Sequence, residues 1–426
     1  MIVGGVEHTA PFGVTSIENP LEVTDDTLFQ IGSTTKTLTA TALMRLAEQG
    51  ELGLDDLVQD HVPEFDLADE TVAKSVTIRQ LLNHTGGWAG DLFVDTGNGD
   101  DSTARYVAEM KELPQLTPLG TLSVYNNAGF AVAGRIIEKV TGETYEHAVG
   151  RLVVEPLGMD QSLFEPSAVM LRRFAVGHHV HPDGKVEIAR PWPVERSGMA
   201  MGGLVSSVAD QLRYARFHMG DGTTDDGSRL LSEQSMVEMQ TPVVEFINDR
   251  WFGLSWMISD LDGTKLVAHG GTTTGQTSDF WMCPERGVAF TSLTNGSTGH
   301  LLNHDLSVMA QKLFLDYAAS EIDPLPVKDP GELDEYTGRY FAEPNREIIE
   351  VQRESNALVI SLVDHGRLVE MFPDRPDMVP STMDFYDTDR VVFRGGDLDG
   401  QKATFLRDGA GAVTYLRWSR LLIKEP

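Results

Sequence analysis

The apolar residues of the chain follow helical spacing in some segments and strand-like alternation in others, in an irregular order. Helical spacing predicts a set of helices at residues 35–49, 77–84, 125–140, 144–153, 206–219 and about 302–318. Strand patterns occur at residues 251–257, 264–269, 277–283 and 286–294. Because strands and helices do not alternate as regular βα units, the pattern argues against a doubly wound sheet. It predicts an α+β fold, in which these strands and the N-terminal segment form an antiparallel sheet beside an all-helical lobe.

Local signals mark where the helix at residues 206–219 begins and ends. Ser207 and Asp210 have the spacing of a capping box, in which each side chain accepts a hydrogen bond from the backbone N–H of the other residue. Gly220 follows the last apolar position and is typical of a helix stop.

The pattern changes after residue 320. Pro324, Pro326 and Pro330 lie among acidic residues, which is typical of a linker. Short alternating runs separated by turn signals then follow at residues 336–341, 347–351, 357–362, 368–371, 391–394, 404–406 and 413–418. They predict a small all-β meander or barrel of roughly eight strands. We therefore expect a first domain at 1–320, a linker at 321–331 and an all-β domain at 332–426.

The composition indicates a globular protein with a strongly acidic surface. The chain has 426 residues, of which 64 are acidic and 34 basic, and its formal net charge is −30. This charge would repel phosphates, so we expect no nucleic-acid partner. No stretch approaches the roughly 18–20 apolar residues that cross a membrane, and the single cysteine, Cys283, excludes an internal disulfide. The first residues lack a basic and apolar leader, which predicts a cytoplasmic location for the sequence as it stands.

Candidate chemistry begins at Ser33, where an apolar run gives way to the first helix. Lys36 lies three residues later, so both side chains share one helical face about one turn apart. The first helical turn also directs unpaired backbone N–H groups toward whatever the serine attacks. This arrangement suits a nucleophile whose proton is taken by a neighbouring amine. Its structural alternative is a helix N-terminus with a solvated lysine.

Two later motifs give the serine and lysine a context. Tyr125 and Asn127 open another helical pattern, and His269 precedes two glycines at the end of a strand pattern. The order Ser-x-x-Lys, Tyr-x-Asn and a basic residue followed by glycine resembles the serine β-lactamase and penicillin-binding-protein superfamily. It is most similar to the branch that holds class C β-lactamases, esterases and D-aminopeptidases.

Further segments carry the same resemblance, which extends over roughly residues 5 to 320. They occur in the family's order at 26–32, 81–87, 156–159, 202–210 and 252–256. The resemblance implies an antiparallel sheet flanked by helices, an all-helical lobe and a site between them. Some relatives similarly append a lipocalin-like β-barrel. Family members usually carry a helix and a strand before the segment that Gly5 to Ser16 resembles, so either the natural start lies upstream or the sheet lacks an edge strand.

The resemblance also implies a role for each residue of the site. Ser33 would become acylated, and either Lys36 or Tyr125 as phenolate would accept its proton; the sequence leaves this choice open. Tyr125 would protonate the leaving group, and Asn127 would orient Lys36 and bind the acyl side chain. The oxyanion hole would be formed by the backbone N–H groups of Ser33 and Thr272, with Gly271 allowing the strand to approach the substrate.

Each of these residues has a structural alternative when it is taken alone. Tyr125 could be an aromatic residue at a helix start, Asn127 a helix cap and His269 a buried, hydrogen-bonded histidine. The segment His178-His179-Val180-His181 suggests a metal site, but the turn signal after it favours a hairpin with solvent-facing imidazoles. The proposed chemistry needs no cofactor and no metal.

Position 269 decides which substrates we expect. Most β-lactamases have a lysine there, whose permanent charge suits an acidic substrate, whereas a histidine offers at most part of a charge. The sequence therefore predicts a serine hydrolase for esters or small amides and peptides, with weak or absent β-lactamase activity. An acyltransferase and a penicillin-binding sensor that stays acylated are the alternatives. We further expect the all-β domain to wall the substrate cleft or to join subunits into a homo-oligomer.

Overall fold

The computed structural model describes residues 1–426 except 182, 193, 248, 319–321, 327–328 and 368–377. Within the described residues the larger sheet has nine strands, in the order β2-β1-β13-β12-β10-β9-β8-β7, with β11 paired to β12. Every pairing between these strands is antiparallel, which confirms the predicted sheet. The strands are β1 (Ile2–Val3), β2 (Val6–Glu7), β7 (Val244–Ile247), β8 (Arg250–Phe252), β9 (Met257–Leu261), β10 (Thr264–Ala268), β11 (Gly271–Thr273), β12 (Gln276–Cys283) and β13 (Val288–Thr294).

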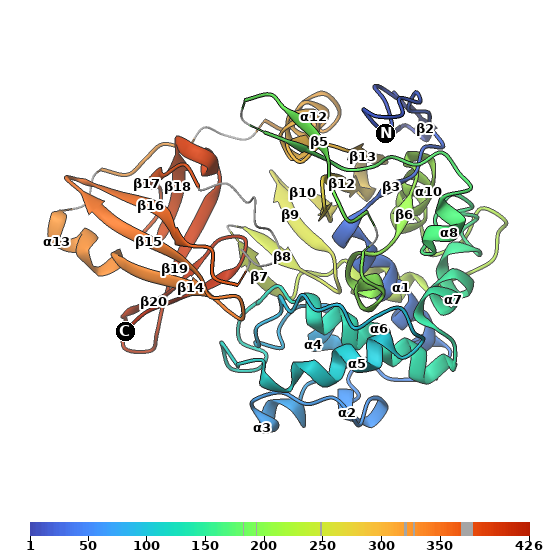
Figure 1. Ribbon diagram of the computed structural model, residues 1–426, viewed down its shortest axis with the longest axis horizontal. Helices are drawn as coiled ribbons and strands as arrows, with labels where there is room; N and C mark the ends of the chain where they lie inside the picture. The colour runs from blue at the N-terminus through green and yellow to red at the C-terminus, as the bar shows by residue number, and fades with distance from the viewer. Residues whose placement is uncertain (182, 193, 248, 319–321, 327–328, 368–377) are drawn as a thin grey trace.

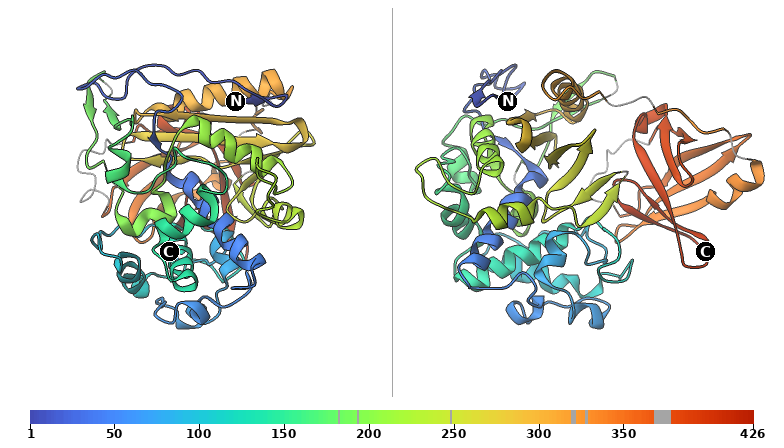
Figure 2. Two further views of the ribbon diagram at one scale, coloured as in Figure 1. Left: turned by 90° about the vertical axis from the view of Figure 1, so that its right-hand side faces the viewer. Right: turned by 180° about the vertical axis from the view of Figure 1, so that it is seen from behind.

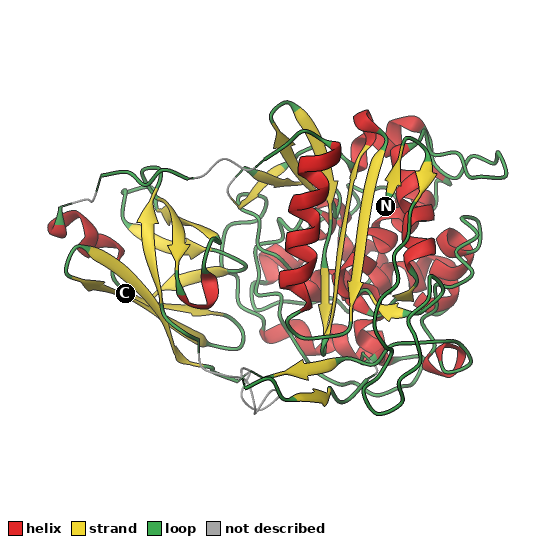
Figure 3. Ribbon diagram, turned by 90° about the horizontal axis from the view of Figure 1, so that it is seen from above, coloured by secondary structure: helices red, strands yellow, loops and turns green. Residues whose placement is uncertain are grey.

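Helices cover both faces of this sheet (Figures 1 and 3). Helix α12 (Gly299–Phe314) crosses one face over β12 and β13, and α10 (Val208–Met219) packs on the same strands from the other face. The helical lobe lies below the sheet in Figure 1. The remaining helices are α1 (Thr35–Glu48), α2 (Val58–His61), α3 (Glu70–Ala73), α4 (Ile78–Leu82), α5 (Ser102–Glu109), α6 (Asn127–Thr141), α7 (Tyr145–Val149), α8 (Pro166–Val169), α9 (Met199–Gly202) and α11 (Glu233–Met239).

Helix α1 is the central helix of the molecule, since eleven of its fourteen residues are buried. Its sequence explains how it tolerates burial on all sides, because its polar residues are mostly threonines. The hydroxyls of Thr37 and Thr41 donate to the backbone carbonyls of Thr34 and Thr37, and Thr39 donates to the carbonyl of Ala200 in α9. Each hydroxyl is therefore satisfied without water, as burial requires.

Several local predictions were wrong, each for a local reason. The strand expected at 251–257 is two strands, β8 and β9, because the backbone turns through Ser255 with a φ of 70°. The segment Gly5–Ser16 is mostly loop, and only the short β1–β2 hairpin joins the sheet, pairing with β13. Ser207 caps α10 by accepting from the N–H of Asp210, but the carboxylate of Asp210 bonds to Ser162 and Gln161 instead, so the capping box is incomplete.

The C-terminal part forms a closed eight-stranded antiparallel barrel, as predicted, seen to the left in Figure 1. Two of its strands, β17 and β21, were not anticipated, and the run expected at 368–371 lies outside the described residues. The division at 320 and 331 stays a prediction, and α13 (Pro330–Leu333) begins inside the expected linker. The strands are β14 (Gly338–Ala342), β15 (Glu347–Glu354), β16 (Ala357–Asp364), β17 (Ser381–Phe385), β18 (Arg390–Arg394), β19 (Lys402–Arg407), β20 (Val413–Arg417) and β21 (Leu421–Lys424).

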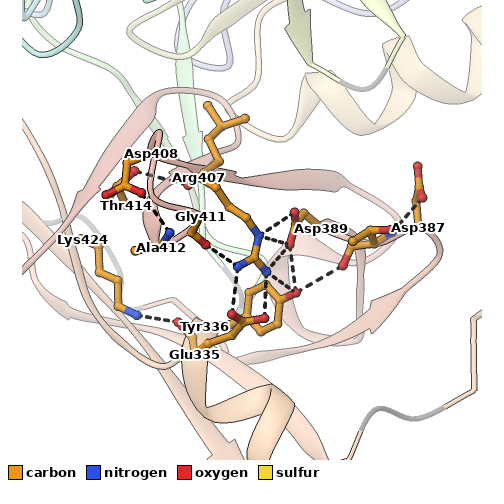
Figure 4. A network of polar contacts seen from close by, with 12 residues as sticks. Glu335, Tyr336, Asp387, Asp389, Arg407, Asp408, Gly411, Ala412, Thr414 and Lys424 are labelled. Carbon is orange, nitrogen blue, oxygen red and sulfur yellow. Dashed lines mark hydrogen bonds and ion pairs between the residues drawn. The ribbon is translucent and has the colours of Figure 1, made fainter.

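A polar network around Arg407 ties the start of the barrel to its later strands (Figure 4). The guanidinium of Arg407 donates to Glu335 at 2.7 and 2.9 Å, to Asp389 at 2.8 Å and to the Gly411 carbonyl at 2.8 Å. The hydroxyl of Tyr336 donates to the same Asp389 carboxylate at 2.9 Å. The network thus links the segment before β14 to the β17–β18 turn and to the end of β19.

Two short strand pairs complete the fold, β3 (Phe29–Gln30) with β6 (Val205–Ser206) and β4 (His178–Val180) with β5 (Val186–Ile188). In the view from behind (Figure 2, right) the barrel lies beside the rest of the molecule, and its strand β19 contacts β7 at the edge of the sheet. Among the described residues, no helix combines the length and apolarity that crossing a bilayer requires.

The network predicts that Arg407→Met lowers the free energy of unfolding by about 1–3 kcal/mol, because two neighbouring carboxylates lose their shared cation. Arg353→Met is the matched control, since Arg353 makes an exposed pair with Asp334 that should contribute less than about 1 kcal/mol. Urea denaturation of both variants measures the difference. Equal destabilisation by the two substitutions would show that the network has no special weight.

Candidate active site

Ser33 lies in a single 3₁₀ turn, Gly32–Thr34, between β3 and α1. Gly32 has a φ of 53°, and a methyl group on it would lie 2.6 Å from the backbone N of Thr272. A methyl group on Gly271 would lie 2.6 Å from the backbone N of Ser33. Both positions therefore require glycine. The close approach of β11 to the turn brings the backbones of Ser33 and Thr272 together. Their use as an oxyanion hole stays a prediction.

Lys36 is completely buried in the first turn of α1, with its amine at the half-buried Ser33. The distance from Lys36 Nζ to Ser33 Oγ is 3.0 Å, and Nζ also donates to the backbone carbonyl of Met201 in α9 at 2.5 Å. Burial lowers the pKa of Lys36 well below its usual value, and the positive charge of Arg420 lowers it further, while Asp91 acts in the opposite direction. The amine is thus placed and tuned to accept a proton from the serine hydroxyl.

Tyr125 lies just before α6, buried next to Lys36. Lys36 Nζ is 5.2 Å from the centroid of its ring, and the imidazole of His84 stacks on the ring at 4.5 Å. Burial raises the pKa of Tyr125 to about 12, although a hydrogen bond with Ser33 and the charge of Arg420 oppose the rise. The phenol therefore holds its proton at neutral pH and can donate it.

The two asparagines after Tyr125 have different partners from those expected. Asn126 caps α6 through the N–H of Gly129, so the cap is not Asn127. The side-chain amide of Asn127 donates to Asp91 at 2.6 Å. Within the described part of the chain it forms no hydrogen bond with Lys36, because the carboxylate of Asp91 takes its N–H. The expected orientation of Lys36 by Asn127 is therefore absent from this arrangement.

His269 follows β10, and its ring is completely buried near Tyr125, with centroids 6.4 Å apart. Its Nδ1 lies 2.7 Å from the carbonyl of Gly270, which can only accept, so Nδ1 carries the proton. Nε2 is buried and has no partner among the described residues. Burial and the charge of Lys36 lower the pKa of His269 to about 3. His269 is thus neutral near neutral pH, rather than partly charged as the sequence suggested.

Two residues of the site were missed in the sequence. Asp91 lies in the loop after the segment 81–87, and Arg420 lies in the turn between β20 and β21 of the barrel. Arg420 Nε donates to Asp91 Oδ2 at 2.5 Å, and its guanidinium carbon lies 4.7 Å from the centroid of the Tyr125 ring. Asp91 and Arg420 are 329 positions apart, so no local sequence pattern could show that they lie together. The barrel thus contributes the side chain of Arg420 to this group of residues. Its expected role as a wall of the substrate cleft stays a prediction.

The histidine-rich segment forms the β4–β5 hairpin, as predicted, but its first imidazole does not face solvent. His178 is buried, donating from Nδ1 to the carbonyl of Asn295 at 2.8 Å and accepting at Nε2 from the N–H of Ile17. These bonds tie the hairpin to the N-terminal loop. Among the described residues no group of three or more His, Cys, Asp or Glu side chains is arranged to hold a metal ion.

Comparisons with known proteins show the family and the fold. Residues 2–312 match the family model described as Beta-lactamase. The chain is 37% identical over 313 residues to "Penicillin-binding protein 4" of Amycolatopsis lactamdurans, covering 72% of this chain and 82% of that protein. It resembles the crystal structure of SurE with a TM-score of 0.77 and 25% identity, over 99% of this chain and 93% of the other. A D-stereospecific amidohydrolase from Streptomyces sp. is similar with a TM-score of 0.53 and 25% identity, over 69% and 88% of the two chains.

The hydrogen bonds of the two buried histidines predict opposite tautomers. His84 Nδ1 accepts from the N–H of Asn126 at 3.0 Å, so its proton is on Nε2, whereas His269 carries its proton on Nδ1. Both pKa values lie below the usual 6.5, so neither ring should titrate between pH 5 and 8. Long-range ¹H–¹⁵N spectra across this range measure both the tautomer and the charge of each ring. A positively charged His269 ring at pH 6, with protons on both nitrogens, would contradict the assignment.

The same pKa values predict how stability depends on pH. A histidine with a folded pKa below 6.5 stabilises the fold above the unfolded pKa, and this contribution is lost as pH falls toward the folded value. His84 and His269 should therefore each lower the free energy of unfolding by up to about 1.4 kcal/mol for every pH unit below pH 6.5. Urea unfolding at pH 7 and pH 5 measures this loss, and the slope should be shallower in His269→Asn.

Proposed function

The chain belongs to the Beta-lactamase family, whose members are serine hydrolases, and within it we propose an enzyme that forms an acyl-enzyme on Ser33. Its substrates are esters or small amides and peptides. One observation carries the proposal: the buried amine of Lys36 lies 3.0 Å from the hydroxyl of the half-buried Ser33. A lysine buried without a carboxylate in contact favours its neutral form, which is the form that accepts a proton.

The acylation step follows from this contact. Ser33 Oγ attacks the substrate carbonyl carbon, and its proton passes to the neutral Lys36 Nζ. The tetrahedral intermediate collapses as the bond to the leaving group breaks and Tyr125 gives its phenolic proton to that group. Lys36 then returns a proton to Tyr125. The high pKa of Tyr125 in the free enzyme favours Lys36 over the phenolate as the first proton acceptor.

Deacylation reverses these proton transfers with water in place of the leaving group. Water attacks the carbonyl of the Ser33 ester, and a proton of the water passes to Lys36 or Tyr125. The bond to Ser33 Oγ then breaks, and Oγ takes up a proton from the same two residues. In both steps the negative charge develops on the former carbonyl oxygen. The backbone N–H groups of Ser33 and Thr272, brought together by Gly32 and Gly271, are the donors proposed to stabilise it.

The proposed substrate class rests on the charge of the residue at position 269. His269 is neutral and presents a bare Nε2, so it accepts a hydrogen bond where a lysine would donate one. The neighbouring cation, Arg420, is paired with Asp91. An acidic group on the substrate therefore meets no unpaired positive charge among these residues. This supports uncharged esters and amides over β-lactams, and the similar D-stereospecific amidohydrolase supports an amide substrate.

The proposed acyl-enzyme predicts a mass increase on Ser33 after brief exposure to acyl donors. The donors would be p-nitrophenyl acetate and butyrate, D- and L-alanine p-nitroanilides, and a D-Ala-D-Ala peptide. Intact-protein mass measures the adduct, which should be absent in Ser33→Ala and present in the exposed-site control Ser75→Ala. Tyr125→Phe should slow acylation by about 10²–10⁴-fold, the usual weight of one general acid. No serine-dependent adduct with any donor would refute the mechanism.

The same panel with nitrocefin tests the predicted specificity. Because position 269 lacks a permanent charge, nitrocefin turnover should be far slower than that of the p-nitrophenyl esters. Added amine or alcohol distinguishes hydrolysis from acyl transfer through the ratio of products. A nitrocefin rate comparable to ester hydrolysis would contradict the preference, and an adduct that persists after one equivalent would indicate a sensor.

A further inference from the structure

Arg420 reaches the candidate active site from a different part of the chain than every other residue in it. Its guanidinium donates to the carboxylate of Asp91 through Nε at 2.5 Å and Nη2 at 3.3 Å, and it lies 4.7 Å from the centroid of the Tyr125 ring. Its Nη1 donates to the backbone carbonyl of the neighbouring Ser419 at 3.0 Å. Asp91 in turn accepts from the side chain of Asn127. The barrel thus places one positive charge against the Tyr125 ring and against the carboxylate that binds Asn127.

Other contacts hold the barrel in this position without using Arg420. Tyr415 donates from its hydroxyl to the carbonyl of Leu116, and Asn345 donates to the backbone carbonyl of Asp91. Arg390 forms ion pairs with Glu245 at 3.1 Å and with Asp249 at 3.0 Å. These contacts hold the barrel against the rest of the chain, and removing the charge of Arg420 leaves them intact.

Few charges surround the lysine and the tyrosine of the site. His84 and His269 pack against Tyr125 and are neutral, as their hydrogen bonds and burial require. Asp91 and Arg420 are the charged groups that act on both Lys36 and Tyr125. The proton affinity of the Lys36–Tyr125 pair is thus set by burial, one anion and one cation.

We propose that Arg420 is a positioning residue of the acyl-transfer reaction, which holds the Lys36–Tyr125 pair in its proton-accepting form and makes the active site a composite of the two domains. The proposal rests on the proposed function. A cation beside an amine disfavours a second positive charge, and a cation over a phenol favours the phenolate. Both effects favour loss of the proton, so the conclusion is the same whether Lys36 or Tyr125 is the base.

The sign of the effect follows for each variant. Removing the positive charge in Arg420→Gln raises the pKa of the catalytic base. The acidic limb of the pH profile, where activity falls because the base takes up a proton, therefore moves to higher pH. Removing the negative charge in Asp91→Asn lowers that pKa, so the acidic limb moves to lower pH. A residue that serves only to dock the barrel would not move the limb in opposite directions for these two substitutions.

The experiment is the pH dependence of kcat/KM for an ester that acylates the wild type, from pH 5 to 9. Arg420→Gln should move the acidic limb up by about one pH unit, which is a roughly tenfold loss of kcat/KM below the limb. Asp91→Asn should move it down. Arg420→Lys keeps the charge and should leave the limb near that of the wild type, and Arg390→Gln, which loses only a docking pair, should leave it unchanged.

Each outcome bears on the proposal. It is overturned if Arg420→Gln keeps the wild-type limb, or if Arg390→Gln shifts the limb equally, since the effect would then come from docking. Thermal unfolding of each variant identifies one that does not fold. If Arg420→Gln does not fold, Asp91→Asn still tests the sign of the shift, with Arg420→Lys as the variant that keeps the charge. A wild-type protein without a Ser33 adduct would refute the proposed function, whereas a wild type that acylates with unshifted variants would refute only the role of Arg420.

Discussion

The burial of one amine, Lys36, is the constraint on which the rest of the site depends. A lysine with no exposed surface is costly to keep charged, and its two hydrogen-bond partners, Ser33 and the Met201 carbonyl, are both uncharged. The surroundings enforce this burial, because α6, α7 and α9 pack against α1. Exposing the amine would let water restore its charge, and in the proposed mechanism Ser33 would then lose its proton acceptor. The central position of α1 is therefore a chemical requirement as well as a packing solution.

The parts of the site that the sequence predicted are those with local signals. Ser33 and Lys36 share a helix start, Tyr125 precedes a helix, and His269 with Gly271 follows a strand. The order of these local signals along the chain, and its resemblance to a known family, singled the residues out. The apolar periodicity likewise located the main helices and the sheet. The shorter elements were less accessible: β17 and β21 are four or five residues long and are defined by barrel closure rather than by a distinctive run.

What the sequence could not predict was the contact between distant segments. Asp91 and Arg420 are ordinary surface residues in their local contexts, and only the docking of the barrel brings them together. The same limitation explains His269, whose identity was clear but whose charge depends on burial and on the carbonyl of Gly270. Residue type and order thus identify the reacting groups, while their protonation depends on tertiary packing that no local pattern encodes.

The contact between the barrel and the first domain also has a consistent polarity. The described ion pairs across it take their cations, Arg390, Arg417 and Arg420, from the barrel, and their anions, Asp91, Glu245 and Asp249, from the other side. In a chain of net charge −30, concentrating cations on one surface opposes the general repulsion between its two parts. The guanidinium carbon of Arg420 lies 4.7 Å from the centroid of the Tyr125 ring, and charges separated by a few ångströms at the edge of a buried site interact by about 1 kcal/mol or more, which is on the order of one pKa unit. The proposed tuning of a buried base therefore requires only one arginine carried on the barrel.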